Sequence, residues 1–466
     1  MDGFIVTLAL PAMARHFGVG LSVLKWVVVA YMLAVTAALL PAGRLADIWG
    51  RKRIIVVGMS ILAVSAVLCA LAPTVETLLV CRVMQGIGGG LVLANVMAEI
   101  TAVFPKAERR KAMAVNASVL AMAQVTGLVV GGLLMGEFGW RSLFLVILTV
   151  SVLGLILSQI ILKSGPRSPG RGSLDWLGTL LSLGAVGVPF LFVETFTGNL
   201  LNPTSLALLM GGTVLLVLFV LMERRASLPL LDLSLFRSRG FTCGSLAAAF
   251  YFVAAVSCYF LLPLYAQIVM GLSPVMAGVL MVPLSIVLTV SSLTVGRLSG
   301  RYGARTLSTA GMLCVSGAVF GLSLPGAEAS YIEFVWPLML LGIGGGLFHP
   351  PNNSATLNNV AKEHLSVANG FLSMARNFGQ AVGAALAATL LAQGLGHGGW
   401  EGAIAGPGGT AFGGPQREAY LSAQQFAFRL AAMFGLIGAA ISALRGVEGA
   451  ASRTSTDSAR QASTEH

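Results

Sequence analysis

The chain has 466 residues, of which 56% are hydrophobic and only 10% are charged, and its mean hydropathy is +0.86. Soluble domains carry roughly 25% charged residues, so a soluble globular protein is excluded. The formal charge of +11 comes from 29 basic and 18 acidic residues, and the basic ones are spread over short polar segments. Because they do not gather on one polar face, we expect no binding of nucleic acid.

Apolar blocks recur along the whole chain and predict an all-α integral membrane protein with fourteen spans. The first block is short for a hydrocarbon core of ~30 Å, so we expect that N-terminal sequence is missing and that the first span is truncated. We place the spans near residues 1–14, 23–42, 54–73, 77–98, 112–135, 142–162, 176–196, 204–222, 243–267, 274–295, 306–325, 333–357, 367–392 and 426–444.

The basic residues indicate how the chain is oriented in the bilayer. With both termini in the cytoplasm, most Lys and Arg residues fall in inside loops or in the tail, and the outside loops hold only Arg15, Lys25, Arg141 and Arg417. This distribution satisfies the positive-inside rule. It predicts a multi-pass protein of the cell (inner) membrane. The Gly-rich stretch at 394–414 is expected to be an outside loop.

Two sequence segments occur twice. GRLADIWGRKRIIVVGM, from Gly43, aligns with GRLSGRYGARTLSTAGM, from Gly296, and GIGGGL occurs from Gly86 and again from Gly342. Each pair is eight spans apart, which indicates two duplicated six-span bundles with two inserted spans between them. Such duplicated bundles are a transporter architecture. We predict an N-terminal bundle, an inserted pair with its inside loops, a C-terminal bundle and a disordered cytoplasmic tail, at residues 1–163, 164–226, 227–445 and 446–466.

Ionisable side chains within spans are functional candidates, because each is costly there unless it is paired or hydrated. Asp2 lies in MDGFIVTLALP. Inside a complete first span, desolvation favours its protonated form, so it could carry a proton, whereas at a frayed terminus it would simply be solvated. Arg82, in CRVMQGIGGG, needs a partner such as Asp2, Gln85 or a carbonyl. The sequence alone does not distinguish a role of Arg82 in a proton relay from a role in an ion pair that holds two helices together.

A second set of candidates could line a cavity. His349 precedes two prolines and Asn352, and we expect the prolines to interrupt the helix so that the imidazole and the amides face a cavity. A hydrogen-bonded packing histidine fits equally well. Aromatic and polar side chains at Tyr31, Gln85, Tyr251 and Tyr259 could form the cavity wall, or they could pack or face lipid.

The charge of the cargo is left open by these residues. A lipophilic cation would need a carboxylate or an aromatic face. An anion or a zwitterion could use Arg376, which lies within the predicted span at 367–392. The sequence does not decide between them.

The inside turn GRLADIWGRKR combines glycines with a charged pattern, at Gly43, Asp47, Gly50 and Arg51. Glycine permits a tight turn, and an acid can face a helix end in one conformation. A turn that only satisfies the positive-inside rule would explain the basic residues, but it would not explain the spacing of the glycines and the acid. We therefore expect these four residues to act as an inside gate.

Glycines in VTGLVVGGLLMG, at Gly127, Gly131 and Gly132, form a small-residue face that lets helices approach closely. GIGGGL lies within a helix and is not followed by Lys-Ser or Lys-Thr, so there is no Walker motif and we expect no use of ATP. Without HExxH, GxSxG or a metal-ligand cluster, a membrane enzyme is disfavoured. We expect no cofactor and no metal.

Taken together, these motifs resemble the major facilitator superfamily and, within it, the fourteen-span drug/proton antiporter branch. The resemblance covers Asp2 to about Arg445. It rests on MDGFIVTLALP, GRLADIWGRKR and CRVMQGIGGG, and also on PLLDLSLFRSRGF, GLSPVMAGVLMVP and ARNFGQAVG. It implies that Asp2 is the proton-coupling carboxylate, that Arg82 is its relay partner, and that Asp47 with Arg51 belongs to the inside gate.

The chain departs from the family pattern at three places. Phe4 and Thr7 stand where the first-span motif usually has Thr and Asn, and Leu128 stands where the antiporter motif has Pro. In the repeated loop, Gly300 replaces the acid. The resulting expectation is a monomeric, proton-coupled exporter of amphiphilic small molecules that works by alternating access. A dedicated metabolite exporter with another coupling mode, a channel or a non-transporting sensor are the alternatives.

Overall fold

The computed structural model of the chain describes residues 5–104, 116, 119, 123, 127, 130–162, 180, 181, 184, 187, 188, 203–225, 233–326, 328–358, 360, 365–404 and 414–445. Within these residues every regular element is a helix, and nine helices are long and apolar enough to cross a membrane. The predicted all-helical membrane fold is confirmed. Most of the predicted spans at 112–135 and 176–196 and the predicted tail at 446–466 lie outside the described residues, so the count of fourteen stays a prediction.

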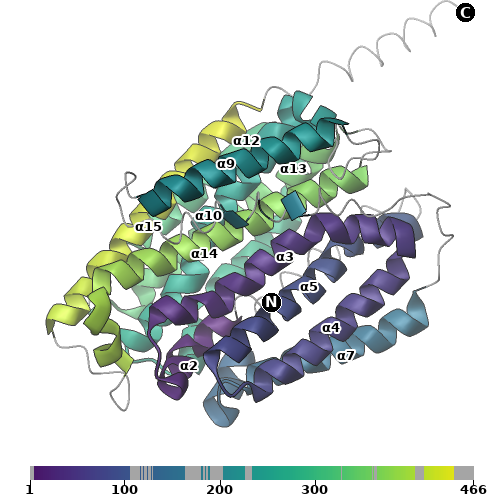
Figure 1. Cartoon of the computed structure of the whole chain (residues 1–466). Helices are drawn as coiled ribbons and strands as arrows, with labels where there is room; N and C mark the ends of the chain where they lie inside the picture. The colour runs from purple at the N-terminus through teal and green to yellow at the C-terminus, as the bar shows by residue number, and fades with distance from the viewer. Residues whose placement is uncertain are drawn as a thin grey trace, which may run out of the picture.

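The N-terminal helices form one group in Figure 1, drawn from purple to blue. Within it, α5 packs against α3 and α4, and α4 packs against α7. Long uninterrupted helices are expected here because a bilayer offers no water to satisfy backbone polar groups. The elements of this group are η1 (Val6–Ala9), α2 (Leu10–Phe17), α3 (Leu21–Trp49), α4 (Arg51–Leu71), α5 (Val75–Val103) and α7 (Ser142–Ile161).

The helices from α10 onward form a second group, drawn from teal to yellow, and α3 and α14 lie side by side where the two groups meet (Figure 1). Within the second group α12 packs against α13 and α15, and α10 packs against α14 and α15. The elements after α7 are α9 (Pro203–Arg225), η2 (Leu233–Arg237), α10 (Arg239–Ile268), α11 (Pro274–Leu280), α12 (Val282–Gly321), α13 (Tyr331–Asn358), α14 (Leu365–Ile404) and α15 (Gly414–Ala443).

The repeated loop has the same backbone conformation in both groups. Gly50 joins α3 to α4 with φ 90°, and Gly303 has φ 72° at a kink that divides α12 into two helices. Glycine adopts such positive φ values readily, whereas other residues are strained there. The predicted spans at 274–295 and 306–325 therefore appear on either side of this kink.

The repeated GIGGGL segments also make matching contacts. A Cβ placed on Gly86 would lie 2.5 Å from the carbonyl oxygen of Tyr31 on α3, and a Cβ on Gly342 would lie 2.6 Å from that of Leu284 on α12. Neither position can hold a side chain, because the neighbour is backbone. Two further glycines in each group approach each other in the same way, as the pairs Gly88 with Gly58 and Gly344 with Gly311. The packing therefore confirms the internal repeat.

Two boundaries differ from the sequence-based expectation. α13 runs through Pro350 and Pro351 to Asn358, so the prolines do not interrupt the helix. Membrane helices tolerate proline because neighbouring helices and polar side chains satisfy the freed carbonyls. In addition, α14 continues to Ile404 and α15 begins at Gly414, so much of the predicted loop at 394–414 is helical. Backbone hydrogen bonds can form a helix without an apolar sequence, so the hydropathy pattern did not reveal that α14 extends to Ile404.

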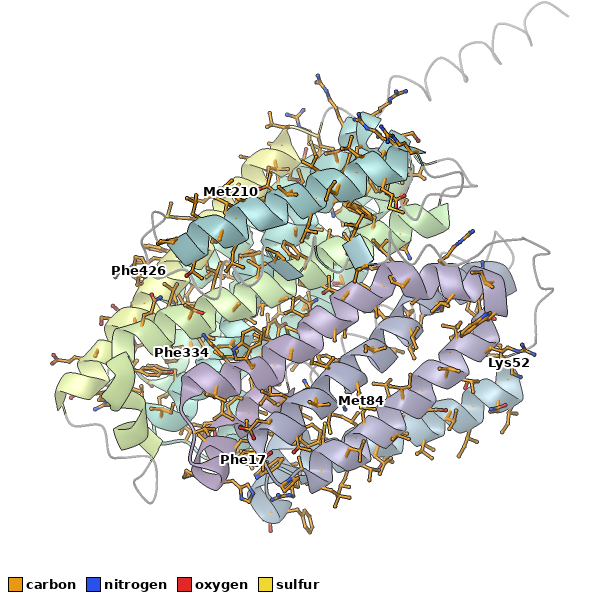
Figure 2. All side chains as sticks on the ribbon, in the orientation of Figure 1. Phe17, Lys52, Met84, Met210, Phe334 and Phe426 are labelled. Carbon is orange, nitrogen blue, oxygen red and sulfur yellow. The ribbon has the colours of Figure 1, made fainter. Side chains whose placement is uncertain are left out.

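The outer surface carries many large apolar side chains. Met210 on α9 and Phe426 on α15 project outward in Figure 2 and are 60% and 56% exposed, whereas Phe334 on α13 is fully buried. An exposed apolar surface of this extent is unfavourable in water and fits the hydrocarbon of a bilayer. The lipid bilayer is thus the surroundings that this surface requires.

Candidate functional site

Arg82 is the largest fully buried side chain among the described residues, and it lies two turns into α5. Its Nε donates to the carbonyl oxygen of Val27 at 2.8 Å, and its Nη1 donates to Oε1 of Gln85 at 2.7 Å. The guanidinium carbon lies 4.3 Å from the centre of the Tyr31 ring. A buried cation needs several such partners. Gln85 and a carbonyl are both among the partners expected from the sequence.

The position of Arg82 follows from the packing of α5 on α3. Gly86, one turn after Arg82, lets the two backbones approach closely. As a result, Tyr31 and Val27 on α3 come within reach of the guanidinium. Asp2, the other predicted member of this site, lies outside the described residues, so its contact with Arg82 stays a prediction.

Side chains near one end of the molecule connect the two groups of helices. Oγ1 of Thr7 donates to the carbonyl oxygen of Tyr259 at 3.3 Å, and Nε2 of Gln267 donates to that of Leu8 at 3.2 Å. Nζ of Lys25 on α3 donates to Oγ1 of Thr389 on α14 at 3.4 Å. In the topology predicted from the positive-inside rule, this end would face the outside. Thr389 gave no sequence signal, because one threonine in an apolar helix is unremarkable.

The glycines at 131 and 132 lie at the same junction. A Cβ on Gly131 would collide with the side chain of Ile5, and a Cβ on Gly132 would lie 2.8 Å from the carbonyl oxygen of Pro274 and 3.0 Å from Cα of Val275 on α11. The expected close approach of helices is therefore present here, and it joins the two groups. Gly127, the third glycine of the motif, is buried.

A second polar cluster lies within the second group, on α10, α13 and α14. The rings of Tyr251 and Phe348 are stacked, with centres 4.9 Å apart and planes 2° apart. The His349 ring lies 4.4 Å from Tyr251 and 5.3 Å from Phe252. Arg376 lies on α14, one turn before Gly379, where a Cβ would collide with the carbonyl oxygen of Ala249 on α10. The structure thus brings Tyr251 and His349 into contact and places Arg376 on a helix that packs closely against the same part of α10.

The side chains of the remaining predicted residues have separate surroundings. Asn352 is buried and its Nδ2 donates to the carbonyl oxygen of Gly244 at 3.1 Å, which ties α13 to α10. Tyr259 is buried on α10. At the opposite end of the first group from Lys25, Gly50 forms the α3–α4 turn and Arg51 begins α4.

The other two inside-gate residues lie in the last two turns of α3. A Cβ on Gly43 would meet no atom within 4 Å, so this glycine is not enforced by packing in this conformation. The backbone of Asp47 is helical, and its side chain is outside the described part of the structure. Next to the turn, Nζ of Lys52 donates to the carbonyl oxygen of Gln159 at the end of α7, at 2.9 Å. A cation at a helix C-terminus is favourable.

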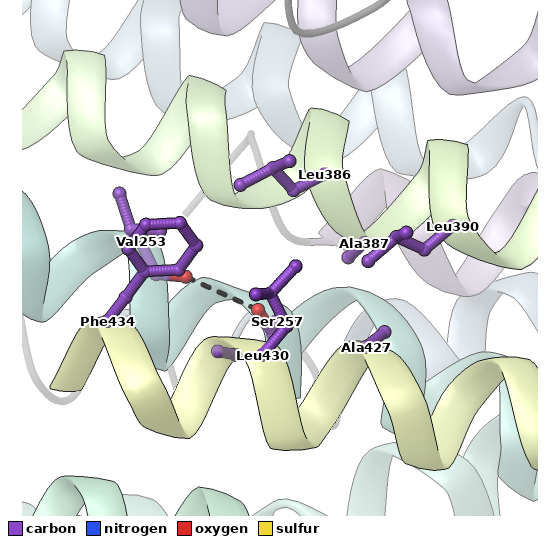
Figure 3. A pocket seen from close by; sticks show the side chains of 9 residues that line it. Val253, Ser257, Leu386, Ala387, Leu390, Ala427, Leu430 and Phe434 are labelled. Carbon is purple, nitrogen blue, oxygen red and sulfur yellow. Dashed lines mark hydrogen bonds between the residues drawn. The ribbon is translucent and has the colours of Figure 1, made fainter. Parts of the chain in front are cut away.

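A small apolar cavity of about 10 Å³ lies between α10, α14 and α15 (Figure 3). Its polar lining residue is Ser257, whose hydroxyl donates to the carbonyl oxygen of Val253 at 3.3 Å. Neither Arg82 nor Arg376 lines this cavity.

Two duplicated groups of apolar helices that meet around buried polar residues define a multi-pass membrane transporter. The chain belongs to the Major Facilitator Superfamily, whose sequence model matches residues 1–384.

Relatives and solved structures agree with this assignment. The chain is 29% identical over 395 residues to the riboflavin transporter RibZ of Clostridioides difficile, covering 85% of this chain and 86% of that protein. It is 32% identical over 396 residues to the multidrug resistance protein Stp of Mycobacterium tuberculosis, covering 84% and 73%. The fold is similar to the inward-facing, unoccupied structure of a bacterial homologue of the human lysosomal transporter Spinster, with TM-score 0.66, 17% identity and coverage of 95% and 93%.

Proposed function

We propose that the chain is a proton-coupled secondary transporter that exports amphiphilic compounds by alternating access. The observation that carries this proposal is the buried Arg82 site next to an interface that is fastened by side chains at one end. The relative named as a multidrug resistance protein supports export. The transporter would lie in the inner membrane with both termini in the cytoplasm and would act as a monomer, with no cofactor, metal or ATP.

In the proposed cycle, two bundles at residues 1–163 and 227–445 rock about a central site, and residues 164–226 contribute the inserted spans. The hydrogen bonds of Thr7, Gln267 and Lys25 across the interface would break when the outer end opens. Gly43, Asp47, Gly50 and Arg51 would close the inner end. Each half of the cycle would thus exchange one set of contacts for the other.

Proton coupling would depend on Asp2 and Arg82. Asp2 would take a proton from the outside and release it to the inside. It would hold a proton or leave room for a substrate, but not both at once. Inward proton movement supplies about 2.3 kcal/mol per charge per 100 mV. That free energy corresponds to about fiftyfold accumulation for one charge moved.

The experiment that tests this function is proton release from acid-loaded proteoliposomes when compounds are added outside. The panel contains lipophilic cations, zwitterions, anions and neutral drugs. We expect some compounds to trigger proton release from the wild-type protein, and we expect Asp2→Asn to abolish it because an amide cannot carry the proton. Glu76→Gln, an exposed acid at the start of α5, is the control and should retain release.

A second candidate function is export or uptake of one dedicated metabolite with another coupling mode. The riboflavin transporter among the relatives favours it. Proton release that stays absent for the whole panel, together with pH-independent flux of a single metabolite, would replace the first proposal by this one.

A further inference from the structure

Arg376 is a positive charge within a helix that crosses the hydrophobic part of the fold. Its Nη2 donates to Oγ of Ser373 at 2.8 Å, one turn earlier on α14. The Arg376 side chain is partly exposed, so an approaching solute can reach the guanidinium. A guanidinium has five donors, and one serine hydroxyl leaves most of them available.

The helices of the second group carry few acids near Arg376. Neither α10 nor the adjoining part of α14 contains Asp or Glu, and the acids of α13, α14 and α15 are Glu333, Glu401 and Glu418. All three lie near the far ends of their helices, at the end where Lys25 meets Thr389. Among the residues that the structure describes, no carboxylate forms an ion pair with Arg376. Within the described part of the chain Arg376 thus has no counter-ion, and a charge kept at this cost is suited to an external anion.

The second half of the cluster is aromatic. Tyr251 is stacked on Phe348, and His349 and Phe252 are the members that remain partly exposed. Gly345 makes this arrangement possible, since a Cβ there would lie 2.7 Å from the Tyr251 hydroxyl. Tyr251 and Phe348 are buried, so His349 and Phe252 form the accessible side of this aromatic cluster.

The geometry points to an anion subsite in which Arg376 binds the carboxylate of a flat aromatic compound while His349 and Phe252 contact its ring system. Guanidinium and carboxylate match in shape and form paired hydrogen bonds. Aromatic walls with one charged group are typical of small-molecule sites. This inference rests on the proposed export function and narrows its substrates to aromatic anions and zwitterions.

The test uses 2-naphthoate and its neutral isostere 2-naphthamide as probes of the purified full-length protein in lipid nanodiscs. Wild-type protein should bind naphthoate about tenfold more tightly than naphthamide, the smallest gain expected for a charged hydrogen bond. In Arg376→Gln this preference should disappear, while naphthamide binding should stay the same. Arg376→Lys should keep part of the preference, since it retains the charge without the planar fork.

The matched control is Arg429→Gln, which removes the same charge from an exposed position on α15. It should retain the full preference for naphthoate. Equal binding of the two probes by the wild-type protein, absence of binding of both, or equal loss of both in Arg376→Gln overturns the subsite. The wild-type comparison remains decisive if Arg376→Gln does not fold.

Proton release separates this inference from the proposed function. An Arg376-dependent preference for naphthoate without proton release by any compound would refute the coupled export while the subsite stands. Conversely, proton release that depends on Asp2, with equal binding of the two probes, would refute the subsite alone.

Discussion

Replacing Arg82 by glutamine is expected to lower transport about a hundredfold, the lower end of what a positioned proton-transfer group contributes, because the cation proposed as the relay partner of Asp2 is removed. The change would leave Oε1 of Gln85 and the carbonyl oxygen of Val27 without their donor in a fully buried site. Initial rates of substrate flux in proteoliposomes measure the effect. Arg82→Lys should restore only part of it, since an ammonium cannot hold both acceptors in the same fork.

A matched control separates this functional role from a structural one. Arg141 also donates from Nε to a carbonyl oxygen, that of Ala70 at 2.9 Å, and it lies 4.4 Å from the centre of the Trp140 ring. It differs from Arg82 in standing at the start of α7, where it ties together helices of the first group. We expect Arg141→Gln to lower the melting temperature as Arg82→Gln does but to retain transport. Similar transport in the two variants would contradict the role assigned to Arg82.

Substituting alanine for Gly132 is expected to shift the protein away from the conformation described here, by about tenfold in population. The new Cβ would lie 2.8 Å from the carbonyl oxygen of Pro274 and 3.0 Å from Cα of Val275, and backbone atoms cannot move aside as a flexible side chain can. Overpacking of this kind costs about 1–3 kcal/mol. We expect the transport rate to fall as well, because the proposed cycle passes through the conformation in which Gly132 contacts Pro274 and Val275.

The measurement is the rate at which an impermeant thiol reagent labels a Lys25→Cys reporter from outside. Lys25 is 6% exposed, so labelling should be slow in the parent reporter and faster with Gly132→Ala. Gly136→Ala is the control one turn later, since its Cβ would lie 3.5 Å from the Val275 side chain, an ordinary contact. The reporter change is common to all three proteins, so its own effect cancels. Equal labelling of the two alanine variants would show that Gly132 does not control the outer end.

Sequence patterns were sufficient for the membrane fold and for the internal repeat. Apolar blocks identify helices because a bilayer imposes both their length and their hydrogen bonding. The repeated motifs identified the matching loops, and Gly50 and Gly303 share the same unusual backbone conformation. The sequence-based prediction was wrong at Pro350 and Pro351. The low helix propensity of proline predicts a break there, whereas α13 is continuous through both residues.

The candidate site was predictable only where its members are close in sequence or belong to a motif. Gln85 is one turn after Arg82, so their hydrogen bond could be anticipated from helical spacing. His349 and Arg376 could each be singled out as costly residues in a span, but their common neighbourhood depends on how α13 and α14 each pack against α10. The Lys25–Thr389 hydrogen bond likewise joins distant helices, and nothing local in the sequence encodes it.

The matching glycine contacts determine which motions are available to this molecule. Where Gly86 meets the backbone of Tyr31 and Gly342 meets that of Leu284, helices touch without intervening side chains, so sliding or tilting within a group would collide at once. Across the junction, by contrast, the contact of Lys25 with Thr389 is one hydrogen bond between side chains, which a rotamer change can break. We therefore expect the two groups to move as stiff bodies, with the angle between them changing more readily than the packing within either.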